Sequence, residues 1–248
     1  MHALRKAPAA NGWLVFSYRP TALFSLKNSR ATSTVGKTLL IPTPYAVKMA
    51  FVDAALRHGL TNDPDQLVRE LSAVGVRIGA PSYACVTGTI QRVRQETRAE
   101  DRKKDRRLPF YRTTIALREI VSYSGLLRVA FDREYGTDHL TEVLSRTAPA
   151  INYFGKRGSF MQYIGSEPRI ALDPSFAKPI GAIAGSRPRQ SQLATLDDFG
   201  PAATFDALNT FTPVEMKRGV HRRFVETAIP YRVRNYGFGF VHYAWLED

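Results

Sequence analysis

The sequence is poor in cysteine and in long apolar segments, and its first 52 residues contain no acidic side chain. Cys85 is the only cysteine among 248 residues, which excludes an internal disulfide and a cysteine-based zinc cluster. No apolar run approaches the ~20 residues that a membrane-spanning helix needs. We therefore expect a cytoplasmic protein that contacts no membrane and holds no metal or other cofactor.

Basic residues dominate what the sequence does contain. Lys and Arg number 35 against 22 Asp and Glu, so the formal net charge is +13. Residues 1–52 hold seven basic and no acidic residue, residues 92–112 hold nine against four, and residues 217–234 hold six against one. An excess of this size predicts attraction to phosphate backbones. Its recurrence in three segments favours nucleic acid, RNA in particular, over a small-molecule substrate.

Apolar periodicity predicts two helices in the first third of the chain, after a strand over residues 11–18. Thr43 fits the N-cap of the first helix and Pro44 its first helical position, and Gly59 ends it. A second, shorter helix is expected within residues 63–75, because Asp63 and Gln66 flank a proline as in a capping box.

Beyond residue 75 the apolar period becomes that of strands. Strands are expected over residues 76–78, 84–93, 110–121, 126–131, 222–231 and 236–245, and a further helix from residue 137 or 138 to about 146. The order strand, helix, strands, helix, strand is that of an α+β fold with a ferredoxin-like (RRM/RAMP-type) βαββαβ core. We expect one domain over residues 1–248, with extra C-terminal strands and an irregular surface segment over 166–192.

A charged run separates two of the expected strands. Residues 94–108 are charged throughout, so we interpret them as a hairpin tip or loop that projects from the sheet. Another basic loop, rich in Ser and Thr, is expected over residues 25–38. Both loops could reach a partner.

The most specific nucleic-acid signal lies near the end of the chain. The principal RNA-contacting strand of RRM domains runs basic, Gly, aromatic, Gly or Ala, Phe, Val, any, aromatic. Residues 236–243 read Tyr-Gly-Phe-Gly-Phe-Val-His-Tyr and fit seven of these eight positions. Tyr236, Phe238 or Tyr243 would stack on bases, while Gly237 and Gly239 would let the backbone approach phosphate.

No metal spacing and no catalytic arrangement is legible among the five histidines. His221 has Arg218, Arg222 and Arg223 around it in the sequence. It is therefore a candidate general base for RNA cleavage, in which a neutral imidazole would remove the proton of a 2′-hydroxyl.

These features together resemble the RAMP superfamily of CRISPR-associated proteins, specifically the Cas family-five subunit of Cascade-type surveillance complexes. The similarity is clearest over the first 60 and the last 30 residues. Members open with a strand ending in an aromatic-Arg-Pro element, as residues 18–20 do here, and a Thr-bearing loop leads them into an Ile-Pro-x-Pro helix start, as in residues 41–44. Their glycine-rich C-terminal segment corresponds to Gly237 and Gly239, and their basic thumb to residues 94–107.

The resemblance implies a non-catalytic subunit that grips the 5′ handle of the CRISPR RNA, caps the backbone filament and touches the large subunit near the target DNA. Base pairing then reads sequence, so the subunit needs a grip on phosphates and a few stacking surfaces. The residues expected to contact RNA are Tyr18, Arg19, Arg30, Lys37, Tyr45, Lys48, Arg102, Lys103, Lys104, Arg106, Arg232, Arg234, Tyr236, Gly237, Phe238 and Gly239.

Two alternatives stay open at this point. Some family members cleave precursor RNA without metal, using a Tyr in the first helix region together with an adjacent Lys-His pair. Tyr45 could match that Tyr, but the chain contains no Lys-His dipeptide, so binding alone is favoured. The second alternative is a general single-strand binder with no preference for a repeat-derived handle.

Overall fold

The computed structural model describes residues 12–28, 36–182 and 190–245. The first sheet contains β1 (Trp13–Pro20), β2 (Val76–Gly79), β5 (Leu127–Asp132) and β6 (Met161–Arg169). Its strand order is β2-β5-β1-β6, and every neighbouring pair is antiparallel. Helices α1 (Pro44–Arg57) and α2 (Pro64–Ala73) link β1 to β2, and α4 (Asp138–Thr147) links β5 to β6. This is the order of a ferredoxin-like βαββαβ core, so the predicted fold is confirmed.

The helices begin where the local sequence signals place them. Thr43 accepts a hydrogen bond from the amide of Ala46 at 3.1 Å, and Asp63 accepts one from the amide of Gln66 at 2.9 Å. Thr137 caps α4 in the same way. Each cap satisfies an amide that the first helical turn would otherwise leave without a partner.

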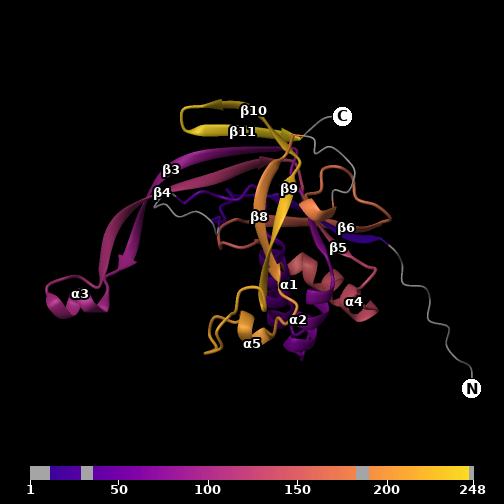
Figure 1. Ribbon diagram of the computed structural model, residues 1–248, viewed down its shortest axis with the longest axis horizontal. Helices are drawn as coiled ribbons and strands as arrows, with labels where there is room; N and C mark the ends of the chain where they lie inside the picture. The colour runs from indigo at the N-terminus through magenta and orange to yellow at the C-terminus, as the bar shows by residue number, and fades with distance from the viewer. Residues whose placement is uncertain (1–11, 29–35, 183–189, 246–248) are drawn as a thin grey trace, which may run out of the picture.

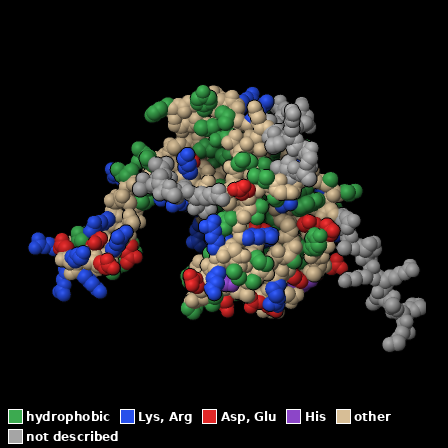
Figure 2. Space-filling view, in the orientation of Figure 1, with side chains coloured by type: hydrophobic (Ala, Val, Ile, Leu, Met, Phe, Trp, Pro, Cys, Tyr) green, Lys and Arg blue, Asp and Glu red, His purple; other side chains and the backbone are tan. Residues whose placement is uncertain are grey.

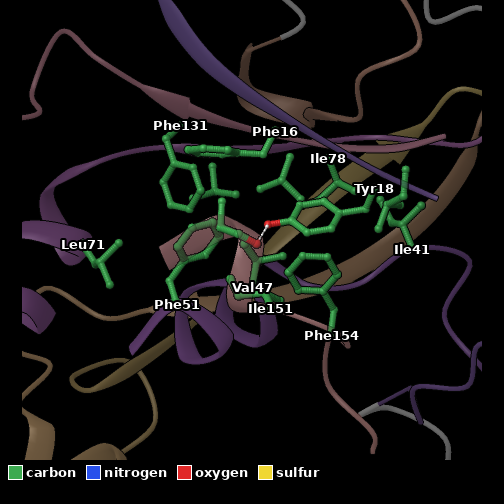
Figure 3. Packing of buried hydrophobic residues seen from close by; sticks show 14 of the residues in the cluster. Phe16, Tyr18, Ile41, Val47, Phe51, Leu71, Ile78, Phe131, Ile151 and Phe154 are labelled. Atoms are coloured by element: carbon green, nitrogen blue, oxygen red, sulfur yellow. Dashed lines mark hydrogen bonds between the residues drawn. The ribbon is translucent and has the colours of Figure 1, made fainter. Parts of the chain in front are cut away.

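Aromatic side chains fill the space between this sheet and its helices (Figure 3). The ring centroid of Phe51, from α1, lies 5.5 Å from that of Phe16 and 4.9 Å from that of Phe131. Tyr18 packs edge-on against Phe154 at 4.9 Å, and its hydroxyl donates to the carbonyl oxygen of Ala148 at 3.1 Å. The core therefore joins α1 to both central strands of the sheet.

A second sheet is inserted between β2 and β5 and completed by the end of the chain. It contains β3 (Tyr83–Glu96), β4 (Tyr111–Ser124), β10 (Tyr231–Gly237) and β11 (Phe240–Trp245), in the order β10-β11-β3-β4. Figure 1 shows the β3–β4 hairpin leaving the body of the molecule with α3 (Ala99–Lys104) at its far end. We call the part of this hairpin beyond Gly88 and Glu119 the thumb.

A third, small sheet contains β7 (Lys178–Pro179), β8 (Gln192–Phe199) and β9 (Arg222–Ile229), in the order β7-β9-β8. Three short helices complete the described elements: η1 (Ala148–Ala150), η2 (Ile180–Ala182) and α5 (Phe205–Leu208).

Residues 166–192 were predicted to form an irregular surface segment; residues 183–189 lie outside the described residues, and parts of the remainder form strands. Its first four residues continue strand β6, and residues 178–179 form β7. Phe176 and Ala177 are buried because Phe176 packs at Gly79 and the Ala177 amide donates to Ile78. Among the described residues, no helix is long and apolar enough to cross a membrane.

Candidate nucleic-acid interface

The RRM-like segment folds as a hairpin rather than as one strand, so the predicted continuous strand over 236–245 is wrong. Gly237 pairs with Phe240, and Phe238 and Gly239 form the turn between β10 and β11. Gly239 has a φ of 84°, a conformation that glycine adopts without steric cost. In a continuous strand Tyr236 and Phe240 would share a face, whereas here they lie on opposite faces of the hairpin.

The tip of this hairpin lies against the base of the thumb. The amide of Gly88 donates to the carbonyl oxygen of Gly239 at 3.0 Å, and Phe240 pairs with Thr87. Phe238 is fully exposed in the turn, and Tyr236 is three-quarters exposed beside it. Figure 2 shows hydrophobic side chains gathered over this hairpin. The aromatic tip is therefore held at a fixed place by the backbone of β3.

Lys37 lies beside β4, at the edge of the second sheet opposite β10, in line with the hairpin tip. The amide of Gly36 donates to Leu117 of β4, and the amide of Glu119 donates back to Gly36, both at 3.0 Å. Because Glu119 pairs with Gly88, the chain beside Lys37, β4, β3 and the hairpin tip form a row of four backbone segments. At about 4.8 Å per strand this row spans roughly 14 Å. The exposed Lys37 thus follows the outermost segment of this row, three strand spacings from the aromatic hairpin.

One face of the second sheet combines aromatic rings with arginines. Tyr83 and His242 have ring centroids 5.7 Å apart, and the guanidinium of Arg234 lies 5.5 Å from the Tyr83 ring. Arg232 and Arg234 are both exposed on the edge strand β10. Bases stack on aromatic rings and arginine binds phosphate, so this face can hold a single strand.

Residues 94–108, predicted as a hairpin tip or a loop that projects from the sheet, lie at the end of the β3–β4 hairpin and include helix α3. Arg102 lies 4.2 Å above the Phe110 ring and pairs with Glu96 at 3.4 Å, while the Thr97 hydroxyl donates to Pro109 at 2.6 Å. Helix α3 was not predicted because its sequence is almost entirely charged and has no apolar residue at helical spacing. Lys103, Lys104 and Arg106 remain exposed, and within the described residues they have no acidic partner.

Two predicted RNA contacts are wrong because the side chains are fully buried. Tyr18 lies in the core, where burial raises the pKa of its hydroxyl well above the usual range. Lys48 lies beneath the third sheet with its ammonium nitrogen 2.7 Å from Asp198 Oδ1, and burial lowers its pKa. Successive side chains of β1 alternate between the core and solvent, and one face of α1 lies against the core. Tyr18 and Lys48 fall on these inward sides.

The remaining predicted residues lie away from the hairpin or cannot be placed. Arg19 is exposed at the end of β1, in the first sheet. Arg30 lies outside the described residues. Tyr243 is half-buried against the core and is not a free stacking surface.

Tyr45 is half-buried in a cavity beside α1, with Arg222 4.5 Å above its ring. Burial raises its pKa, and the charge of Arg222 opposes this rise. His221 lies next to Arg222 in the chain and accepts a hydrogen bond from the amide of Lys217 at 3.1 Å. Within the described ranges, no three His, Cys, Asp or Glu side chains gather in a way that could hold a metal ion.

Sequence reasoning missed Tyr83 and His242 as members of the interface. The two are 159 positions apart, and only the pairing of β11 with β3 places their rings together. A signal was present, since Tyr83 begins a strand and His242 falls within the RRM-like segment, but the register between these strands is not encoded locally.

Comparison with known proteins gives distant structural matches. No protein-family model matches the chain, and no curated protein sequence matches it. The fold is similar to that of a CRISPR protein from Archaeoglobus fulgidus, at 14% identity and a TM-score of 0.47, over 95% of this chain and 92% of that chain. It is also similar to a chain of a CRISPR RNA-guided surveillance complex, at 13% identity and a TM-score of 0.42, over 87% of each chain.

Proposed function

We propose that this protein is a non-catalytic RNA-binding subunit of a type I CRISPR Cascade complex, which grips the 5′ handle of the CRISPR RNA and caps the backbone filament. The observation that carries the proposal is the convergence at the base of the thumb. There, the aromatic β10–β11 tip, the chain at Lys37 and the root of a basic projection occupy one continuous sheet. The family resemblance in residues 16–20, 41–44 and 236–239 supplies the identity of the RNA.

The chemistry of this surface suits a guide RNA whose sequence is read by base pairing. Exposed Arg232, Arg234 and Lys37 can neutralise phosphates at any sequence, which fixes the position of the strand. Tyr83, Phe238 and Phe240 offer ring faces on which bases of any type can stack. The protein therefore needs no base-specific hydrogen bonds for this role.

An assembly partner is supported by the apolar side chains that the isolated chain leaves in water. On the thumb, Ile90 is 70% exposed, Ile115 68% and Leu117 44%, and strand pairing places all three on one face. Exposed apolar rows of this kind mark contact surfaces. We propose that neighbouring subunits of the complex, the backbone and large subunits, and the target DNA beside them cover such surfaces.

The absence of catalysis is part of the proposal. A tyrosine that acts as a general base must lose its proton, and burial disfavours the charged phenolate of Tyr45. His221 has basic neighbours in the sequence, but Val220 precedes it. It therefore does not form the Lys-His pair that accompanies the tyrosine in cleaving family members.

Removal of two arginines from β10 tests the RNA grip. We expect Arg232→Ala combined with Arg234→Ala to weaken binding of handle RNA and to lower the slope of log affinity against log salt by up to about two, because two phosphate contacts are lost. The measurement is fluorescence anisotropy with labelled repeat RNA at several salt concentrations.

The matched control removes the same charge elsewhere. Arg69 and Arg146 are exposed on α2 and α4, where Arg69 pairs with the exposed Asp63 and Arg146 with the exposed Glu142. Arg69→Ala combined with Arg146→Ala should leave the slope close to that of the unaltered protein. Equal slopes for the two double variants would remove β10 from the RNA site.

A further inference from the structure

The cavity beside α1 is used by none of the roles assigned above. Its volume is about 760 Å³, within the range of 300–1,000 Å³ typical of small-molecule sites. Helix α1 forms one wall, the chain at residues 25–27 and 151–156 forms the second, and β8, β9 and the residues from 205 to 211 close the third. It therefore lies against the helix layer, and no residue of the thumb or of the β10–β11 hairpin lines it.

Aromatic side chains contribute to the walls of this cavity together with aliphatic ones. Tyr45, Tyr153, Phe205 and Phe211 all line it, and Phe211 is 96% exposed in the isolated chain. A planar ring placed against Tyr153, Phe205 or Phe211 would remove apolar surface from water and gain ring-to-ring contact. The walls thus favour a flat, largely apolar group.

The rim carries uncompensated positive charge. The side chain of Leu26 packs directly on Gly155, so Lys27 and Lys156, which follow them in the chain, flank the same edge of the cavity. Both lysines are exposed and have no acidic partner within the described residues. The two carboxylates of the cavity are already neutralised, because Asp53 pairs with Arg57 at 3.0 Å and Asp197 with Arg222. The free charge at the rim is therefore cationic.

We propose that this cavity binds one nucleotide unit, with the base against the aromatic and aliphatic side chains of the walls and the phosphate at Lys27 and Lys156. The hydroxyl of Tyr45 is available to the edge of the base, since its contact within the molecule is the Met216 sulfur at 4.0 Å. A free nucleotide and the end of an RNA strand share this chemistry. The site is separate from the sheet interface and does not depend on the function proposed above.

A fluorescent nucleotide tests the site directly. The probe is 2-aminopurine riboside 5′-monophosphate, titrated with the full-length protein, and stacking inside the cavity should quench its fluorescence. AMP should displace the probe, and adenosine should do so about tenfold less well, because it lacks the group that the two lysines bind. The absence of saturable quenching would overturn the proposal.

Substitutions of exposed lysines test whether the cavity binds the phosphate, and they leave the core of the protein unchanged. Lys27→Ala combined with Lys156→Ala should weaken probe binding by roughly tenfold, whereas Arg69→Ala combined with Arg146→Ala, which removes the same charge, should not. Met49→Trp, which fills the cavity from α1, should abolish binding in protein whose thermal unfolding remains cooperative. Equal affinity of the lysine variant and its control would refute the site.

Competition identifies the source of the nucleotide. Displacement of the probe by a 5′-phosphorylated single-stranded RNA at concentrations well below those of AMP would assign the cavity to a strand end. Displacement by mononucleotides alone would assign it to a free nucleotide. Because the probe is a mononucleotide, the titration tests binding in the cavity even for a protein whose second sheet binds no RNA.

Discussion

Lys48 shows how a basic residue can contribute to structure rather than to RNA binding. Its ammonium group is buried, pairs with Asp198, and lies 5.5 Å from the Phe199 ring centroid, while Arg223 approaches the other carboxylate oxygen at 2.8 Å. This cluster connects α1 to the third sheet. The structure of the cluster predicts a large effect on stability and none on RNA affinity.

Replacement of Lys48 by Met should lower the free energy of unfolding by about 3 kcal/mol, because the buried Asp198 loses its closest cation and keeps its pair with the half-exposed Arg223. Urea unfolding measures this loss. Arg57→Ala, which breaks the exposed pair with Asp53, should cost less than ~0.5 kcal/mol. Reduced RNA affinity of the folded Lys48→Met protein, with stability unchanged, would restore the original interpretation of Lys48 as a phosphate contact.

Two buried tyrosines and the half-buried Tyr123 make stability depend on alkaline pH. Burial raises the pKa of Tyr18, Tyr123 and Tyr231 above the ordinary value of 10.0, and each hydroxyl donates to a backbone carbonyl. Above pH 10 the unfolded chain loses these protons while the folded protein keeps them. The stabilisation is therefore complete below pH 10 and declines as the pH rises further.

The Tyr231→Phe variant tests this dependence. It should lose about 1 kcal/mol at pH 8, where its hydrogen bond to Pro81 is missing, and its stability should fall less steeply between pH 10 and 11, by about 1 kcal/mol per pH unit. Urea unfolding at a series of pH values gives both quantities. Parallel curves for the variant and the unaltered protein would contradict the predicted linkage.

At the scale of elements, the β10–β11 hairpin depends on one glycine. At a φ of 84°, a side chain at Gly239 costs roughly 1–2 kcal/mol, and more for a β-branched residue. Gly239→Val should therefore loosen the tip, accelerate hydrogen exchange of the Gly88 amide that donates to it, and weaken RNA binding. The core should unfold as before.

The control for this variant is Gly165→Val in β6. Gly165 lies in β6 next to a register shift against β1, but its φ is not positive, no atom lies within 4 Å of the position of an added Cβ, and valine suits strands. It should leave exchange at Gly88 unchanged. Loss of RNA binding in Gly165→Val and not in Gly239→Val would exclude the hairpin from the interface.

The elements that sequence analysis predicted correctly are those set by local interactions. Thr43, Asp63 and Thr137 cap helices through contacts three residues away, so the three main helices begin at or next to the predicted residues. Strand β8 was missed because Asp197 and Asp198 interrupt its apolar pattern. Their burial depends on Arg222 and Arg223 of β9, which lie 25 residues away.

The candidate interface was predictable in composition but not in arrangement. The basic thumb and the aromatic-glycine segment are both legible, and both lie in the second sheet. Their meeting at Gly88 depends on the register of β11 against β3, which long-range packing sets. The turn at Phe238 and Gly239 was misread because an aromatic-glycine run fits a strand consensus and a tight turn equally well.

For the whole molecule, shape and charge support a role at the end of an assembly. The ferredoxin-like core lies at one side, and the thumb extends from it with lysines and arginines around α3 (Figures 1 and 2). A free-standing protein gains no stability from such an arm, since its apolar face and its charge remain in water. In the proposed function, RNA and neighbouring chains fill the space beside the arm.

Purification of the tagged protein from its native host tests this role. We expect CRISPR RNA with a uniform 5′ end and several companion proteins to co-purify, identified by sequencing and mass spectrometry, because the proposal assigns RNA to the second sheet and neighbouring subunits to the apolar face of the thumb. Phe238→Ala combined with Arg234→Ala should reduce the recovered RNA. Heterogeneous RNA without companions would indicate a general single-strand binder, and cleavage of repeat RNA by the isolated protein in EDTA would indicate the metal-independent ribonuclease instead.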